Sequence, residues 1–114
     1  MKLSVAKEDG LVRAELAGRL DAAGIEAAQD QFTAQVVDPG QPALVGLSQV
    51  EFMASMGIAM LVRAAKRLDK AGAVLVLHSA PPMVAEVMTM AGLDRLVPVA
   101  PDAAEAERLA VSRS

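Results

Sequence analysis

Ser55 is the residue of this sequence best suited to act as a nucleophile. It lies in the segment Met53-Ala54-Ser55-Met56-Gly57, which is close to the G-x-S-x-G spacing that exposes a serine between a strand and a helix in hydrolases. Such a serine would need His78 as its base and an acid such as Asp94 to orient that base. Met53 replaces the first glycine of the pattern, and its side chain would crowd the strained turn. We therefore predict no catalytic residues and no enzymatic activity.

Two further interpretations of Ser55 depend on its place at the start of a helix. In the first, its hydroxyl caps free backbone N–H groups, which stabilises a helix by about 1 kcal/mol. In the second, Ser55 accepts a phosphate, because helix N-termini favour negative charge and offer N–H donors. Local chemistry favours the cap, and both interpretations stay open.

Side chains that could bind metals, nucleotides or nucleic acids are scarce. His78 is the single histidine and cysteine is absent, so we expect no metal site. Neither of the glycine-rich phosphate-binding patterns occurs, so we expect no cofactor. A net charge of −3 and only two aromatic residues, Phe32 and Phe52, argue against nucleic acid as a partner, because such binding uses basic patches and stacking platforms. For His78, a buried strand-end histidine with a backbone partner is favoured over a pH sensor near the Ser55 loop.

Length and hydropathy predict one small cytoplasmic domain. The chain has 114 residues, 54% of them hydrophobic and 22% charged, which suits a single folded domain over residues 1–114. The longest uncharged run, Ala71 to Ala85, is shorter than the about 20 residues that cross a bilayer, so no membrane insertion is expected. The lack of an apolar leader and of cysteine favours the cytoplasm.

Hydrophobic periodicity predicts five strands. Val12, Ala14 and Leu16 alternate with charged neighbours, as in a strand with one solvated face. The turn before them, Glu8-Asp9-Gly10, is typical of a hairpin. Continuous apolar runs indicate strands covered on both faces. The predicted strands are Leu3–Lys7, Leu11–Leu16, Ala43–Leu47, Ala73–Leu77 and Leu96–Val99.

Helical spacing predicts about four helices. Asp21 can cap the first, which carries apolar residues three or four positions apart from Ile25 to Val36 and ends at Asp38-Pro39-Gly40. The other helices are predicted over Ser55–Lys70, Pro82–Ala91 and Pro101–Val111. The order β-β-α-β-α-β-α-β-α predicts an α/β fold with a single mixed β-sheet of about five strands, parallel in the middle and covered by the helices.

Two segments resemble one known family. Gly18-Arg19-Leu20-Asp21, which precedes a helix, is similar to the G-x-L-D of STAS domains, the anti-sigma factor antagonists. The run from Leu44 to Ile58, LVGLSQVEFMASMGI, resembles their signature of apolar-apolar-Asp-Leu-Ser, a short spacer, and aromatic-apolar-Asp-Ser-Ser-Gly-apolar. The resemblance covers residues 3–110 and implies a STAS-like fold with a regulatory, non-enzymatic function.

The sequence departs from this signature at three positions. Gly46 stands where the family usually has aspartate, and Ala54 replaces the aspartate before the serine pair. Met56 replaces the second serine, which the partner kinase modifies in phosphoregulated members, whereas Ser55 matches the first serine. A thioether cannot accept phosphate. The resemblance therefore implies either that Ser55 is a substitute phosphoacceptor or that docking is independent of phosphate.

The resemblance also implies a partner. This would be an anti-sigma factor that is an ATP-binding serine protein kinase, and its capture would release a sigma factor and raise transcription. The alternative is a STAS docking subunit of a transport or sensory complex without phosphoregulation, and a homodimer is a further interaction left open. We predict that partner binding involves Asp21, Met53, Ala54, Ser55, Met56, Gly57, Met60 and Arg63.

The helix over Ser55–Lys70 is expected to have two opposite faces. The apolar face would carry Ile58, Leu61, Val62, Ala65 and Leu68. At 100° per residue, the opposite face would carry Met56, Met60, Arg63 and Arg67. We predict that Met56 and Met60 face solvent, where methionine suits an adaptable binding surface that Met83 could extend. The alternative is that a loop or the last helix covers them.

Overall fold

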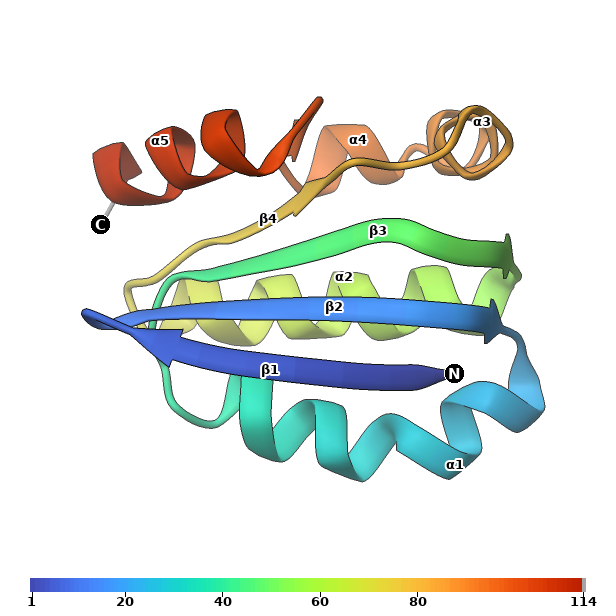
Figure 1. Ribbon diagram of the computed structural model, residues 1–114, viewed down its shortest axis with the longest axis horizontal. Coiled ribbons are helices and arrows are strands. Elements are labelled where there is room, and N and C mark those ends of the chain that lie inside the picture. The colour runs from blue at the N-terminus through green and yellow to red at the C-terminus, as the bar shows by residue number, and fades with distance from the viewer. Residues whose placement is uncertain (114) are drawn as a thin grey trace.

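The protein is built on one mixed β-sheet (Figure 1). The computed structural model describes residues 1–113. Its strands are β1 Lys2–Glu8, β2 Leu11–Leu20, β3 Ala43–Met53, β4 Leu75–His78 and β5 Val99–Ala100. They form a five-stranded sheet in the order β1-β2-β3-β4-β5, in which β1 and β2 are antiparallel and all later pairs are parallel. The predicted mixed sheet is confirmed.

The hairpin between β1 and β2 follows from its turn residues. Asp9 and Gly10 both have positive φ angles, 51° and 77°, as the two central residues of a type I′ turn require. Val12, Ala14 and Leu16 are buried, whereas Glu15 is exposed and Arg13 is half-buried. The alternation seen in the sequence therefore separates the two faces of β2.

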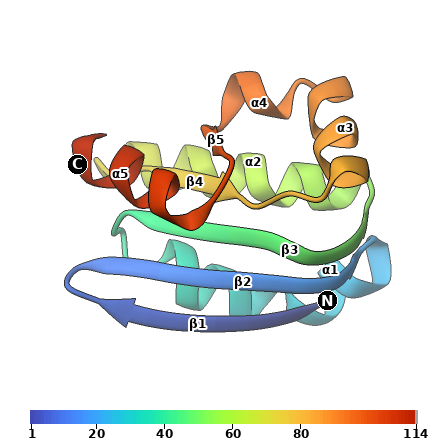
Figure 2. The ribbon, with the colours of Figure 1, turned by 45° about the horizontal axis from the view of Figure 1, so that its top comes forward.

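Five α-helices and one π-helical turn surround the sheet within residues 1–113. They are α1 Ala22–Phe32, the π-turn η1 Thr33–Val37, α2 Ser55–Lys70, α3 Pro82–Met90, α4 Leu93–Leu96 and α5 Ala103–Arg113. Figure 2 shows α2 behind the sheet and α5 in front of it. The main core lies on the side of α1 and α2, where Ile25, Phe32, Leu61 and Leu68 are fully buried. A second, smaller cluster joins Leu11, Leu44 and Val76 to Ala106 and Ala110 of α5.

The segment between α3 and α5 differs from the prediction. Leu96 ends the short helix α4 instead of starting a strand, and β5 contains only Val99 and Ala100. The reason is Gly92, whose φ of 74° turns the chain so that the fully buried Leu93 enters the core. The predicted strand over Leu96–Val99 is therefore wrong in its first three residues.

Two strands extend further than predicted, and this places the candidate site. β2 continues to Leu20 and β3 to Met53, whereas β4 stops at His78, which lies opposite Gly46. The ends of β2 and β3 therefore project beyond β4 at one end of the sheet.

Candidate functional site

The two segments that carry the STAS resemblance meet where β2 and β3 end. In the parallel register Arg19 lies opposite Phe52, and Leu20 lies opposite Met53. The Ala54 N–H then donates a hydrogen bond to the Leu20 carbonyl at 3.0 Å. This bond continues the pairing past the end of β3 and holds the start of α2 against the end of β2.

Gly57 allows α2 to begin this close to β2. A Cβ atom at this position would lie 2.9 Å from both the Cβ and the carbonyl oxygen of Leu20. Because interiors are close-packed, any larger residue would push α2 away from β2. Gly57 is buried, so it positions the site without forming part of its surface.

Asp21 caps α1, as predicted, and belongs to a small polar group at the surface. Its Oδ1 accepts from the Gly24 N–H at 2.9 Å, and its Oδ2 accepts from Arg19 Nε at 3.1 Å. The Gly24 N–H, and then the Arg19 guanidinium, hold the pKa of the Asp21 carboxyl below its ordinary value of 3.8. The same guanidinium lies over the Phe52 ring, 4.4 Å from its centroid. Sequence reasoning missed Arg19 and Phe52 as site residues, although each is the last residue but one of two neighbouring parallel strands.

Ser55 does not cap α2, contrary to the interpretation that local chemistry favoured. The N-cap is Ala54, which has extended backbone angles and offers no side-chain hydrogen bond. Ser55 is the first helical residue, is exposed, and makes no side-chain hydrogen bond to any residue that the structure describes. The missing aspartate or serine at position 54 therefore leaves the first N–H groups of α2 without a side-chain acceptor.

The methionines at the start of α2 do not share one environment. Met56 is 46% exposed, whereas Met60 is 3% and Met53 4% exposed, so the prediction that Met60 faces solvent is wrong. The buried side of α2 consists of Gly57, Met60, Leu61, Ala64 and Leu68. Packing against two neighbours sets this rotation, because α2 contacts α1 as well as the sheet. Ile58, Val62 and Ala65 of the predicted apolar face are only half-buried.

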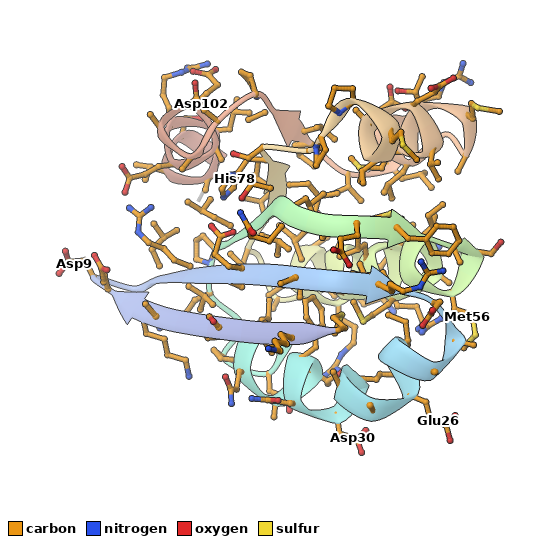
Figure 3. All side chains as sticks on the ribbon, turned by 45° about the vertical axis from the view of Figure 1, so that its right-hand side comes forward. Asp9, Glu26, Asp30, Met56, His78 and Asp102 are labelled. Atoms are coloured by element: carbon orange, nitrogen blue, oxygen red, sulfur yellow. The ribbon has the colours of Figure 1, made fainter. Side chains whose placement is uncertain are left out.

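His78 lies away from this site, on the side of the sheet that faces α5. Figure 3 shows it near Asp102 and well apart from Met56, so the suggestion that it approaches the Ser55 loop is wrong. The reason is that β4 ends opposite Gly46, seven positions before the end of β3. His78 Nδ1 is 2.8 Å from the Ser79 hydroxyl, a side-chain partner instead of the backbone partner expected. Burial lowers the pKa of His78 below 6.5.

Neither a metal cluster nor a membrane-spanning helix is found among the described residues. No group of three or more His, Cys, Asp or Glu side chains within residues 1–113 could hold a metal ion. No helix in the same part of the chain is both long and apolar enough to cross a membrane.

Comparison with known proteins assigns the family. The family model described as the STAS domain matches residues 2–106. The chain belongs to the STAS domain family. A relative from Bordetella bronchiseptica, BtrV, assigned as an anti-sigma factor antagonist, is 31% identical over 100 residues, which cover 88% of this chain and 86% of the relative. The chain is therefore a STAS protein that resembles the anti-sigma factor antagonists.

Solved structures share the fold. A Thermotoga maritima protein, also assigned as an anti-sigma factor antagonist, superposes with a TM-score of 0.86 at 19% identity and covers 96% of this chain and 94% of its own. The murine anion transporter Slc26a9 matches with a TM-score of 0.79 at 19% identity, over 94% of this chain but 18% of the transporter. The same fold is therefore found as a separate small protein and as part of a large transporter.

A close contact between β2 and β3 requires glycine at position 46. The carboxylate of Glu15 lies directly over Gly46, where a Cβ atom would overlap its oxygens. Glu15 and His78 are the register partners of Gly46 on β2 and β4. The Glu15 carboxylate on β2 therefore occupies the space that a side chain at position 46 of β3 would need. The sequence alone gave no sign of Glu15, because this contact depends on the register between two strands.

Proposed function

We propose that this STAS protein is an anti-sigma factor antagonist that binds an anti-sigma factor with serine-kinase activity through the end of β2, the end of β3 and the start of α2. The proposal rests chiefly on the hydrogen bond from the Ala54 N–H to the Leu20 carbonyl. That bond joins the two segments with the family resemblance into one surface. The likeness to BtrV supports the same function. The chain itself carries out no reaction in this scheme.

The exposed and buried residues of this surface have different roles. Ser55, Met56 and Phe52 are exposed and Asp21 is half-buried, so these side chains would contact the partner. Met53 and Gly57 are buried and, with the half-buried Ala54, they position the contact residues. Met60 belongs to the core and would contact no partner directly.

The phosphate switch, where present, would act at Ser55. The kinase would transfer the terminal phosphoryl group of ATP to the Ser55 hydroxyl, and ADP and the hydroxyl proton would leave. The hydroxyl is exposed and carries no intramolecular hydrogen bond among the described residues. Phosphate adds about two negative charges, which the start of α2 would tolerate but a close interface would not, because those charges lose their hydration there.

Substitution of Met56 tests this surface. Met56→Asp places a carboxylate in the proposed interface, and we expect at least a tenfold loss of affinity for the purified kinase-type anti-sigma factor in calorimetry. Met90→Asp is the matched control, because Met90 is 80% exposed on α3 and lies outside the surface. Both variants should keep the thermal midpoint of the parent. Equal affinities for the two variants would contradict the proposed surface.

A second candidate function is a docking subunit of a transport or sensory complex without phosphoregulation. Met56 favours this function, because it stands where the family signature has the serine that accepts phosphate. Incubation with the kinase and ATP, followed by mass spectrometry, separates the two functions. Phosphate on Ser55, absent from Ser55→Ala, supports the switch. The absence of both stable kinase binding and phosphate on Ser55 supports the docking subunit of another complex.

A further inference from the structure

A groove runs between α1 with its π-turn and α2. Its volume is about 230 Å³. The floor is apolar and almost fully buried, and it consists of Phe32, Val37, Met60 and Ala64. The rim is polar and consists of Gln29 and Thr33 on the side of α1 and of Arg63 and Arg67 on α2. The groove therefore combines an apolar floor with a basic edge.

The protein itself neutralises only part of this basic edge. α2 carries four basic residues and one acidic residue in a chain whose net charge is −3. Arg67 Nη2 pairs with Asp38 Oδ1 at 3.0 Å. Arg63, in contrast, is exposed and makes no ion pair or hydrogen bond with any residue described in the structure. The nearby acids of α1, Glu26 and Asp30, point outward from the protein (Figure 3).

The groove is continuous with the proposed docking surface. At 100° per residue Met56, Met60 and Arg63 lie along one side of α2, so the groove begins about one helical turn beyond Met56. Its volume is below the roughly 300–1,000 Å³ of small-molecule pockets. A groove of this size suits an inserted side chain better than a separate ligand.

We propose that this groove receives an acidic segment of the protein partner, in which an apolar side chain enters the groove and a neighbouring carboxylate pairs with Arg63. This inference rests on the proposed function and names the chemistry of the partner at that surface. A guanidinium is suited to this pairing, because its planar donors match a carboxylate bidentately. Charge complementarity of this kind contributes to partner choice and to the rate of association.

Charge reversal at Arg63 tests the groove, and Arg95 provides the control. Arg95 on α4 is also exposed and without an ion pair among the described residues, so Arg95→Glu makes the same charge change elsewhere. With the purified kinase-type anti-sigma factor as the probe, we expect Arg63→Glu to weaken binding at least tenfold and Arg95→Glu less than twofold. Arg63→Gln should weaken binding several-fold and reduce its dependence on salt between 50 and 200 mM, as expected when one ion pair is lost.

Several outcomes would overturn the inference. If Arg63→Glu binds with the parental affinity, the groove is not part of the interface. If Met56→Asp at the same time loses affinity, the proposed function still holds. No binding by the unmutated chain would overturn both proposals. The groove can also be followed through the chemical shifts of Thr33 and Arg63. If these shifts change on titration with succinate or inorganic phosphate but do not change on titration with the partner, the groove binds a small anion instead of the partner. Thermal midpoints check folding and should stay near the parental value, because Arg63 makes no ion pair or hydrogen bond with any described residue.

Discussion

At the scale of single residues, two glycines allow close contacts between neighbouring elements, and the contact of Gly57 with Leu20 positions the proposed docking surface. Gly57 leaves room for Leu20, and Gly46 leaves room for the carboxylate of Glu15. Each contact joins residues far apart in the sequence, so substitutions at these positions move an element instead of altering one surface group. The exposed Met56 is the opposite case, because its side chain can change with little effect on packing.

His78 is a residue whose titration should be visible in the stability of the protein. Burial lowers its pKa below 6.5, and the nearby Arg13 acts in the same direction, whereas Glu15 and Asp102 oppose it. Between pH 6.5 and this lowered pKa the unfolded chain binds a proton that the folded chain does not. Stability therefore falls as the pH decreases through that interval. We expect urea unfolding at pH 7.5 to 5.0 to show this loss.

His78→Asn should remove this part of the pH dependence. The Asp21 carboxyl does not interfere, because its pKa is lowered from 3.8 and its contribution is lost only at more acidic pH. An identical slope between pH 6.5 and 5.0 in the parent and in His78→Asn would show that another group is responsible.

At the scale of elements, α2 shows both the strength and the weakness of sequence reasoning. Its bounds, Ser55–Lys70, are as predicted, because the helical pattern and the glycine after it are local signals. Its rotation was predicted incorrectly, since Met60 and Ala64 are buried beside α1. Periodicity identifies an apolar stripe, but contacts with a second helix decide which edge of that stripe is covered. The site prediction therefore included Met60, a core residue.

The rotation of α2 can be tested with two methionine substitutions. Met60→Ala should lower the free energy of unfolding by about 2–4 kcal/mol, because it removes a buried side chain and leaves a cavity. Met56→Ala should change it by less than about 0.5 kcal/mol, since exposed substitutions have small effects. Urea unfolding at neutral pH measures both values. Similar losses in the two variants would contradict the rotation.

At the scale of the whole molecule, the sheet and its strand directions could be predicted, and the interface between its layers could not. The alternation in β2 and the continuous apolar run in β3 can be recognised from the local sequence. The division of the apolar residues into two clusters cannot be predicted from the local sequence, because Leu44 and Val45 are adjacent in the sequence yet belong to opposite faces of the sheet. The end of β4 opposite Gly46 likewise depends on register, and it decides that His78 lies apart from Met56.

The two apolar clusters predict that α5 can detach from the sheet while the main core stays folded. α5 is held to the sheet by small residues and by the ion pair between Arg13 and Glu107, a limited contact compared with the main core. Ala106→Asp would bury a carboxylate in the second cluster, where Ala106 is fully buried. The variant should therefore release α5 while the main core stays folded. Hydrogen exchange should show faster exchange across Ala103–Arg113 and unchanged protection in β2 and β3.

Ala104→Asp is the matched control for this opening. Ala104 is exposed on the same helix, so the carboxylate stays hydrated and α5 should keep its parental exchange rates. Because the proposed docking surface lies at the ends of β2 and β3, Ala106→Asp should also retain the parental affinity for the proposed anti-sigma factor partner. Loss of protection throughout the sheet in Ala106→Asp would show instead that the two clusters unfold as one cooperative unit.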